Sequence, residues 1–204
     1  SAASDVYKRQ DAKAWSAVKK VTAGWGDTDT RYNKELPAKA TAGSISLTAW
    51  RGEKVSAQLA VSTPEKLSAL TFEAGDLTGS ASTISKANVR TAFVRYVMAD
   101  ELQKDGQNTC GGRNQDEYRH FLVADPIDHI TRQLDMEPNT TRCGWVSISV
   151  PQNAKSGTYR GTVEVKADGK TIASLRLNLK VTNRTLPSAK DWKFHLDLWP
   201  VSYT

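Results

Sequence analysis

Two pairs of adjacent acidic residues, Asp100-Glu101 and Asp116-Glu117, are the first features of this sequence that could do chemistry. Two carboxyl groups that flank one bond can act as acid and as base or nucleophile, as in the hydrolysis of glycosidic linkages. Neighbouring residues of a strand point to opposite faces, so neither pair converges on one bond without special geometry. The pattern therefore favours solvated surface acids at both places, with a catalytic pair as the alternative.

A second cluster combines His120 and His129 with Asp125 and Asp128. Imidazole and carboxylate groups are ligands for zinc or calcium. The spacing of these four residues matches no known ligand pattern, so we expect no metal. The sequence also lacks a GxSxG or Cys-His nucleophile and a glycine-rich phosphate loop, and no cofactor is predicted.

The two cysteines, Cys110 and Cys143, lack the Cys-x-x-Cys spacing of a zinc site. They either pair as a disulfide or stay free and buried. A bridge requires Cα atoms within about 7 Å of each other and an oxidising compartment. The sequence leaves both possibilities open.

The chain has six tryptophans, and exposed aromatic rings can stack on sugars. For four of them the core is the favoured position: Trp15, Trp25, Trp50 and Trp145.

The 204 residues are 39% hydrophobic and 25% charged, which is typical of a globular domain. The net charge is +6, but the 28 Lys and Arg residues are spread along the chain. Nucleic-acid binders usually carry a basic block or stripe, so no nucleic-acid partner is expected. No apolar run approaches the roughly 20 residues of a transmembrane helix, and no membrane insertion is predicted.

Alternation of apolar and polar residues predicts an all-β domain. Strands are expected around residues 45–49, 55–61, 70–72, 89–97 and 146–150. Before them, residues 12–23 suggest a short helix or an irregular lead-in, and residues 24–43 suggest a surface loop.

The clearest hairpin joins two alternating runs, residues 159–165 and 175–181, through Asp168-Gly169. Asp-Gly between such runs is a strong hairpin signal because both turn residues take a positive φ. Short strands without intervening helices predict an antiparallel immunoglobulin-like β-sandwich. Residues 98–140 are too polar and too rich in glycine for this pattern and are expected to form one long inserted loop region.

The pattern breaks again at residues 183–187, which suggest a linker, and a new strand is expected over residues 192–199. The resulting division is a lead-in (11–43), a sandwich (44–186) and a linker with the first strand of a second domain (187–200). His195, Asp197 and Trp199 share one face of that last strand.

Both ends of the chain resemble a sequencing adapter. Residues 5–10 back-translate to a DNA string whose reverse complement encodes Val-Ser-Tyr-Thr, the sequence of residues 201–204. The string is similar to the transposase mosaic end of sequencing libraries. We therefore expect residues 1–10 and 201–204 to be foreign tails that do not pack on the domain. On this interpretation residues 11–200 are an internal piece of a longer protein.

Several segments, in order, resemble the N-terminal domain of glycoside hydrolase family 123. They are WRGEKVSAQL (50–59), FVRYV (93–97) with Asp100-Glu101 after it, Cys110-Gly111, LVADPID (122–128), Trp145-Val146, Val150-Pro151, GTYRGT (157–162) and DWKFHLDLW (191–199). The last of these is similar to the first strand of the family's catalytic barrel.

The resemblance implies a secreted or cell-surface parent of Bacteroides-type bacteria that cleaves β-linked N-acetylgalactosamine. Its barrel would carry an Asp-Glu pair, and the acetamido oxygen of the substrate would attack the anomeric carbon. That pair would lie beyond residue 200, so no catalytic residue is assigned in this chain. His195, Asp197 and Trp199 would line the sugar site of the parent or, alternatively, pack inside the barrel.

Two functions follow for the chain itself. The first is an accessory sandwich that supports the C-terminal catalytic barrel of the same protein, whose substrate would be a glycan. The second is an independent carbohydrate-binding module, which needs an exposed aromatic platform. The outward residues of the late strands favour the first function because they contain no tryptophan: Thr162, Glu164, Arg176 and Asn178.

Overall fold

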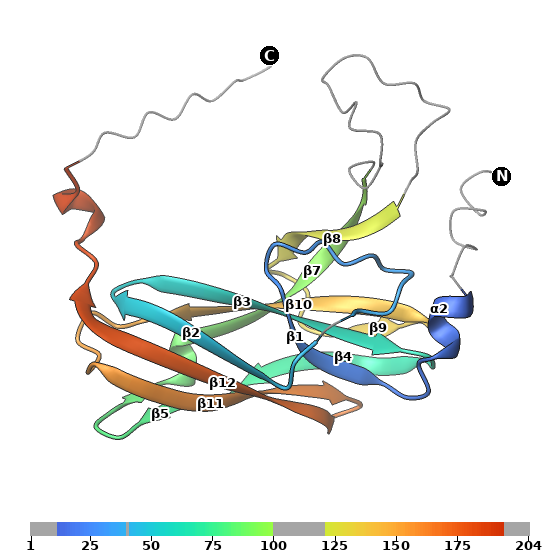
Figure 1. The fold of residues 1–204 in the computed structure, drawn as a ribbon, viewed down its shortest axis with the longest axis horizontal. Helices are drawn as coiled ribbons and strands as arrows, with labels where there is room; N and C mark the ends of the chain where they lie inside the picture. The colour runs from blue at the N-terminus through green and yellow to red at the C-terminus, as the bar shows by residue number, and fades with distance from the viewer. Residues whose placement is uncertain (1–11, 40, 100–120, 194–204) are drawn as a thin grey trace, which may run out of the picture.

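Two β-sheets pack face to face in this protein, for which a computed structural model describes residues 12–39, 41–99 and 121–193 (Figure 1). The first sheet has five strands, in the order β1 (Thr22–Gly26), β3 (Lys54–Thr63), β10 (Thr140–Ser149), β7 (Val89–Ala99) and β8 (Phe121–Asp128). The second has seven, in the order β2 (Ser44–Arg51), β12 (Lys170–Thr185), β11 (Gly157–Ala167), β4 (Leu67–Ala74) and β9 (Leu134–Met136). Its two other strands are β5 (Leu77–Gly79), which also pairs with β11, and β6 (Thr83–Ile84), which pairs with β5. The described helical elements are α2 (Ala12–Ser16) and the 3₁₀ turns η1 (Lys86–Asn88) and η3 (Ala189–Asp191). The prediction of an all-β sandwich is confirmed.

The predicted hairpin joins β11 to β12. Asp168 and Gly169 have φ values of 49° and 72°, so both turn residues are left-handed, as a tight hairpin requires. Ala167 pairs with Lys170 directly across the turn.

One strand pair departs from the antiparallel expectation. β12 pairs in parallel with β2, with Leu177 opposite Ile45 and Leu179 opposite Leu47. A tight turn enforces antiparallel pairing only between strands that follow each other along the chain. No such turn links β2 and β12, so turn signals could not reveal their relative direction.

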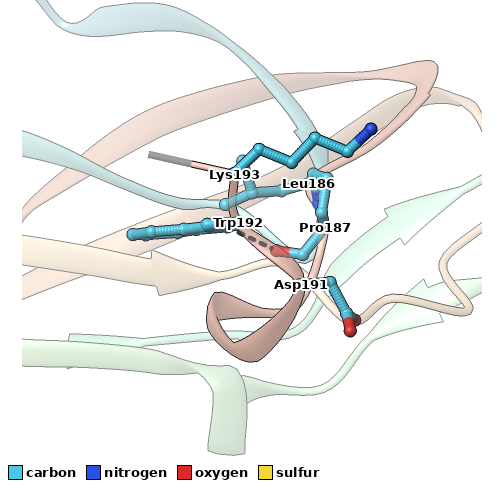
Figure 2. A pocket seen from close by; sticks show the side chains of 5 residues that line it. All are labelled: Leu186, Pro187, Asp191, Trp192 and Lys193. Carbon is cyan, nitrogen blue, oxygen red and sulfur yellow. Dashed lines mark hydrogen bonds between the residues drawn. The ribbon is translucent and has the colours of Figure 1, made fainter. Parts of the chain in front are cut away.

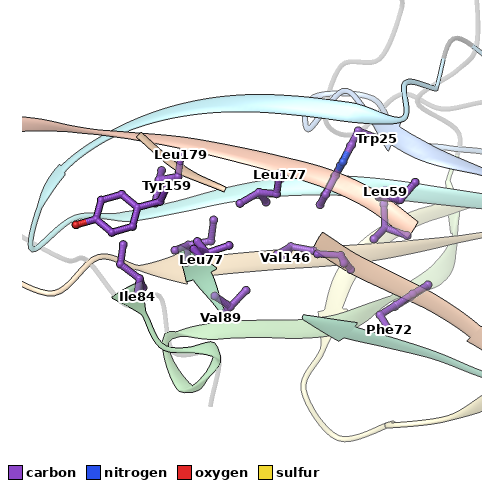
Figure 3. Packing of buried hydrophobic residues seen from close by; sticks show 14 of the residues in the cluster. Trp25, Leu59, Phe72, Leu77, Ile84, Val89, Val146, Tyr159, Leu177 and Leu179 are labelled. Carbon is purple, nitrogen blue, oxygen red and sulfur yellow. The ribbon is translucent and has the colours of Figure 1, made fainter. Parts of the chain in front are cut away.

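The core lies between the inner faces of the two sheets (Figure 3). Alternate residues supply it, because alternate side chains of a strand point to the same face. On β3 these are Ala57, Leu59 and Val61, and on β12 they are Leu175, Leu177, Leu179 and Val181. Full burial of one such leucine or valine side chain stabilises the fold by about 1.5–3 kcal/mol.

Strands also form in segments for which loops were predicted. Strand β1 (Thr22–Gly26) spans the end of the predicted lead-in (12–23) and the start of the predicted surface loop (24–43). Phe121–Asp128 and Leu134–Met136 are strands within the expected insertion. Gly24 helps to explain the first difference. A Cβ on Gly24 would lie 2.6 Å from the Cβ of Thr41, so the strand needs a glycine there, and glycine weakens a strand signal.

Two of the four tryptophans expected in the core are buried. Trp15 and Trp25 are 4% and 3% exposed, and their indole N–H groups donate to the carbonyl oxygens of Glu35 and Arg176. Trp145 is only partly buried. The prediction is wrong for Trp50, which is 37% exposed because its neighbour Ala49 takes the inward position on β2.

Candidate functional site

Many residues singled out from the sequence lie outside the described ranges. They are Asp100, Glu101, Cys110, Asp116, Glu117, His120, His195, Asp197 and Trp199, together with both suspected adapter tails. Trp192 and Lys193, at the start of the expected last strand, are described and follow η3 without strand structure.

The described members of the histidine and aspartate cluster have separate roles. Asp125 forms an ion pair with Arg31, at 3.5 Å between Oδ1 and a guanidinium nitrogen. Asp128 is almost fully buried at the end of β8. It accepts hydrogen bonds from the backbone N–H groups of Ile130 (2.8 Å) and Thr131 (3.0 Å). Within residues 12–39, 41–99 and 121–193, no three His, Cys, Asp or Glu side chains gather into a group that could hold a metal ion.

The side chains around Asp128 complete its environment. Thr131 Oγ1 and Arg95 Nε each donate to Oδ2 at 2.7 Å. The hydrogen bonds from Thr131 and Arg95 favour the charged form and lower the pKa of the Asp128 carboxyl well below its usual value. The ionised carboxylate of Asp128 therefore stabilises the turn that follows β8.

Replacing Asp128 by Asn should lower the free energy of unfolding at pH 7, because the amide loses two charge-assisted bonds. A carboxyl whose pKa is depressed on folding stabilises the protein above its unfolded pKa of about 3.9. That contribution is lost as pH falls from there toward the folded pKa. Urea denaturation should therefore show the largest difference in free energy of unfolding between wild type and Asp128→Asn at pH 7. This difference should become smaller below about pH 4. An equal difference in free energy of unfolding at pH 7 and below pH 4 would show that the charge of Asp128 does not stabilise the fold.

Cys143 lies on the outer face of the five-stranded sheet and is fully buried. Its neighbours there are Tyr32, Ala60, Val94 and Ala124, which form a small second core under the segment that precedes β2. Burial raises the pKa of its thiol to about 12, so the group is unreactive while the domain is folded. Pairing with Cys110 stays a prediction.

A hollow of about 560 Å³, hereafter the exit groove, lies beyond the end of β12 (Figure 2). It is lined by Leu186, Pro187, Asp191, Trp192 and Lys193. The indole N–H of Trp192 donates to the carbonyl oxygen of Pro187 at 2.9 Å, which holds the ring beside Pro187. Trp192 is still 41% exposed.

The neighbouring end of β2 anchors the exit groove to the sandwich. The N–H of Leu186 donates to the carbonyl oxygen of Arg51 at 2.8 Å, and Arg51 also donates to the carbonyl oxygen of Asn183 at 2.6 Å. The exposed Trp50 precedes Arg51, with the guanidinium of Arg184 5.4 Å from its ring centre. This end of the domain therefore presents two indole rings to its surroundings on an ordered backbone.

A second hollow of about 390 Å³, hereafter the outer groove, lies on the outer face of the five-stranded sheet. One side is the segment of residues 28–31 that follows β1. Gln58 of β3, Trp145 of β10 and Asp125 of β8 are among the strand residues that line it. The sequence singled out Trp145 as an expected core residue and Asp125 as a possible metal ligand. Nothing in the sequence indicated that the two residues line one groove.

Two packed sheets with a filled core define a β-sandwich domain, a fold that supports many unrelated functions. Residues 25–167 match the glycoside hydrolase 123 N-terminal domain, and the chain belongs to this family. The resemblance deduced from the sequence is thereby confirmed.

Comparison with solved structures agrees on the fold. A family 123 glycoside hydrolase from Clostridium perfringens, studied for glycolipid glycan hydrolysis, superposes with a TM-score of 0.69 at 22% identity. The match covers 82% of this chain and 28% of that chain, so the present chain spans less than a third of its length.

Weaker likenesses include Spo0M, a sporulation control protein from Bacillus subtilis, with a TM-score of 0.37, 9% identity and coverage of 81% and 49% of the two chains. The PapD-like domain of human CEP192 follows with a TM-score of 0.32, 12% identity and coverage of 82% and 87%. No curated protein sequence matches the chain. In the part of the chain that the structure describes, no helix has the length and apolar character to span a bilayer.

Proposed function

We propose that this chain is the non-catalytic N-terminal domain of a secreted glycoside hydrolase and that it supports a C-terminal catalytic barrel. Membership of the family and the short span of the match to the Clostridium hydrolase support this reading. The barrel would cleave β-linked N-acetylgalactosamine with the acetamido group of the substrate as nucleophile, and it would supply the acid and the orienting carboxylate.

The observation that carries the supporting role is the exit groove. Leu186 and Trp192 are partly exposed apolar side chains on a segment held to β2 by backbone hydrogen bonds. Domain interfaces within one chain bury surface of this kind, and a fixed linker sets the angle between the domains. The exit groove is therefore suited to receive the next domain.

The Asp128 carboxyl also fits a non-catalytic role. A general acid at neutral pH needs a raised pKa, whereas hydrogen bonds depress the pKa of Asp128. Asp125 is engaged by Arg31. The hydrogen-bonded Asp128 side chain is not set up to protonate a leaving group.

Hydrolysis of p-nitrophenyl N-acetyl-β-galactosaminide tests the catalytic part of the proposal. The isolated chain should release no nitrophenol, while the full-length parent should hydrolyse the substrate. Turnover by the isolated chain would contradict the non-catalytic role, and Asp100-Glu101 would then be the first pair to replace. An inactive parent would remove the glycosidase assignment and leave the fold unchanged.

The supporting part is tested in the same full-length protein with Trp192→Ala. Loss of the indole from the exit groove should lower the temperature at which hydrolase activity is lost. Ile172→Ala is the matched control, because Ile172 is 38% exposed on the hairpin that begins β12. Equal inactivation temperatures for the two variants would contradict a docking role for the exit groove.

A further inference from the structure

We infer that the outer groove is a binding site for an uncharged saccharide, with Trp145 as the aromatic surface and the residue 28–31 segment as the opposite side. The site lies on the outer face of the five-stranded sheet and is separate from the exit groove. It needs no residue of a second domain.

The sheet itself brings the first two side chains together. Gln58 on β3 and Trp145 on β10 are direct cross-strand partners, so their side chains lie next to each other on the same face. Trp145 is partly buried, which holds its ring in place. Among the described residues its indole N–H has no hydrogen-bond partner, so this group is available to a ligand.

The loop side of the outer groove is built in advance. Gln58 is 3% exposed, and its Nε2 donates to the carbonyl oxygens of Asp27 (2.7 Å) and Thr30 (2.9 Å). The N–H of Asp27 donates to the hydroxyl of Tyr32 at 3.1 Å, and the N–H of Ala124 donates to the carbonyl oxygen of Tyr32 at 2.9 Å. A buried amide thus ties the loop to β3, and Tyr32 ties it to β8. A ligand would not have to order this loop on binding, which limits the entropic cost.

The charges of the outer groove indicate the class of ligand. Arg31 and Asp125 form an ion pair between the loop and β8, with side chains 48% and 43% exposed, and Asp29 adds one more carboxylate. A phosphate ligand would meet a net negative lining, which disfavours it. A purely apolar ligand would leave these polar groups unsatisfied. Hydroxyl groups can both donate to carboxylates and accept from a guanidinium and an indole N–H, while the apolar face of a sugar ring packs on an aromatic ring.

The size of the hollow agrees with this class. Ligand pockets typically measure about 300–1,000 Å³, and the outer groove measures about 390 Å³. That volume suits one or two sugar rings. The choice of N-acetylgalactosamine as one of the probes rests on the proposed function. The inference that the outer groove binds a saccharide rests only on its lining residues.

Titration of the ¹⁵N-labelled chain with N-acetylgalactosamine, galactose, glucose and their β-linked disaccharides into the millimolar range tests the inference. At least one sugar should shift the indole N–H resonance of Trp145 and the side-chain amide resonances of Gln58, and leave those of Trp192 in place. Trp145→Ala should weaken the apparent Kd about tenfold or more, which corresponds to about 1.4 kcal/mol. Asp125→Ala, which removes an exposed side chain, should weaken it as well.

Trp192→Ala is the matched control, since it removes an indole that lines the exit groove and not the outer groove, and it should leave the Kd unchanged. Absence of shifts at Trp145 and Gln58 with every sugar would overturn the inference. So would unchanged binding in both Trp145→Ala and Asp125→Ala, or loss of binding in Trp192→Ala alone. Because the titration measures no hydrolysis, an inactive parent would contradict the proposed function without affecting this result.

Discussion

Replacing Leu177 by Ala should lower the free energy of unfolding by about 2–5 kcal/mol, the usual range for a buried leucine. Leu177 is 1% exposed at the centre of β12, where it faces the core between Trp25 and Leu179 (Figure 3). Its strand is paired on both sides, with Gly161 of β11 and Ile45 of β2 opposite this residue. Because both neighbours are held in register, the cavity cannot collapse easily, and the loss should fall toward the upper part of that range.

Urea denaturation followed by tryptophan fluorescence measures the effect. Ile172→Ala on the same strand is the control, because Ile172 is 38% exposed and should change the free energy by no more than about 0.5 kcal/mol. The denaturant slope should be the same for all three proteins, since a change in slope would report a different unfolded state. Similar midpoints for Leu177→Ala and Ile172→Ala would contradict the placement of Leu177 in the core.

Adding one methyl group to Gly161 should also destabilise the domain, by about 1–3 kcal/mol. A Cβ on Gly161 would lie 2.6 Å from a methyl carbon of Leu77 and 2.7 Å from the carbonyl oxygen of Asp76. The methyl group could turn away, but the carbonyl belongs to a backbone segment that Gly75 holds through a 3.0 Å hydrogen bond to Thr162. Relief of the contact therefore requires β5 to move away from β11.

Gly43→Ala is the matched substitution, because no atom lies within 4 Å of a Cβ at Gly43 and its φ is not in the left-handed region. It should be neutral or stabilise the fold by about 0.4–1 kcal/mol, because alanine lowers the conformational entropy of the unfolded chain. Thermal unfolding of the two variants side by side gives the comparison. If Gly161→Ala unfolded at the same temperature as Gly43→Ala, the close approach of β5 and β11 would be wrong.

Strands whose two faces differ in polarity were predictable from the sequence. β12 alternates between core-facing apolar residues and exposed or partly exposed polar residues, and the Asp-Gly turn fixes how β11 and β12 meet. β3 alternates larger apolar residues with Ser56, Gln58, Ala60 and Ser62, although both of its faces are buried from Ala57 onward. The family resemblance agrees with this part of the chain. Period and turn chemistry are local properties, so they can be read without knowing any neighbour.

Other strands gave weak signals for physical reasons. β1 carries two glycines in five residues, and β9 has only three residues. β8 contains Pro126, which is tolerated there because β8 is an edge strand. In each case the contacts that select a strand come from distant segments rather than from the local pattern.

The outer groove was beyond sequence reasoning for the same reason. Gln58 and Trp145 are brought together only by the register of β3 and β10, and Arg31 reaches Asp125 only because the loop after β1 crosses the sheet. The sequence marked Trp145 as a residue of interest. Its partial burial beside the residue 28–31 segment could not be read from the sequence.

The position of β12 has a consequence for synthesis on the ribosome. This strand is the last that the structure describes, yet it lies inside its sheet, between β2 and β11. Until Lys170–Thr185 has left the exit tunnel, both neighbours have open edges with unpaired N–H and C=O groups. The edge of β2 (Ser44–Arg51) stays open while residues 52–169 are made, whereas the edge of β11 waits only for the hairpin that follows it. A chain that stops before Lys170 would keep them and would be prone to pair with other copies of itself.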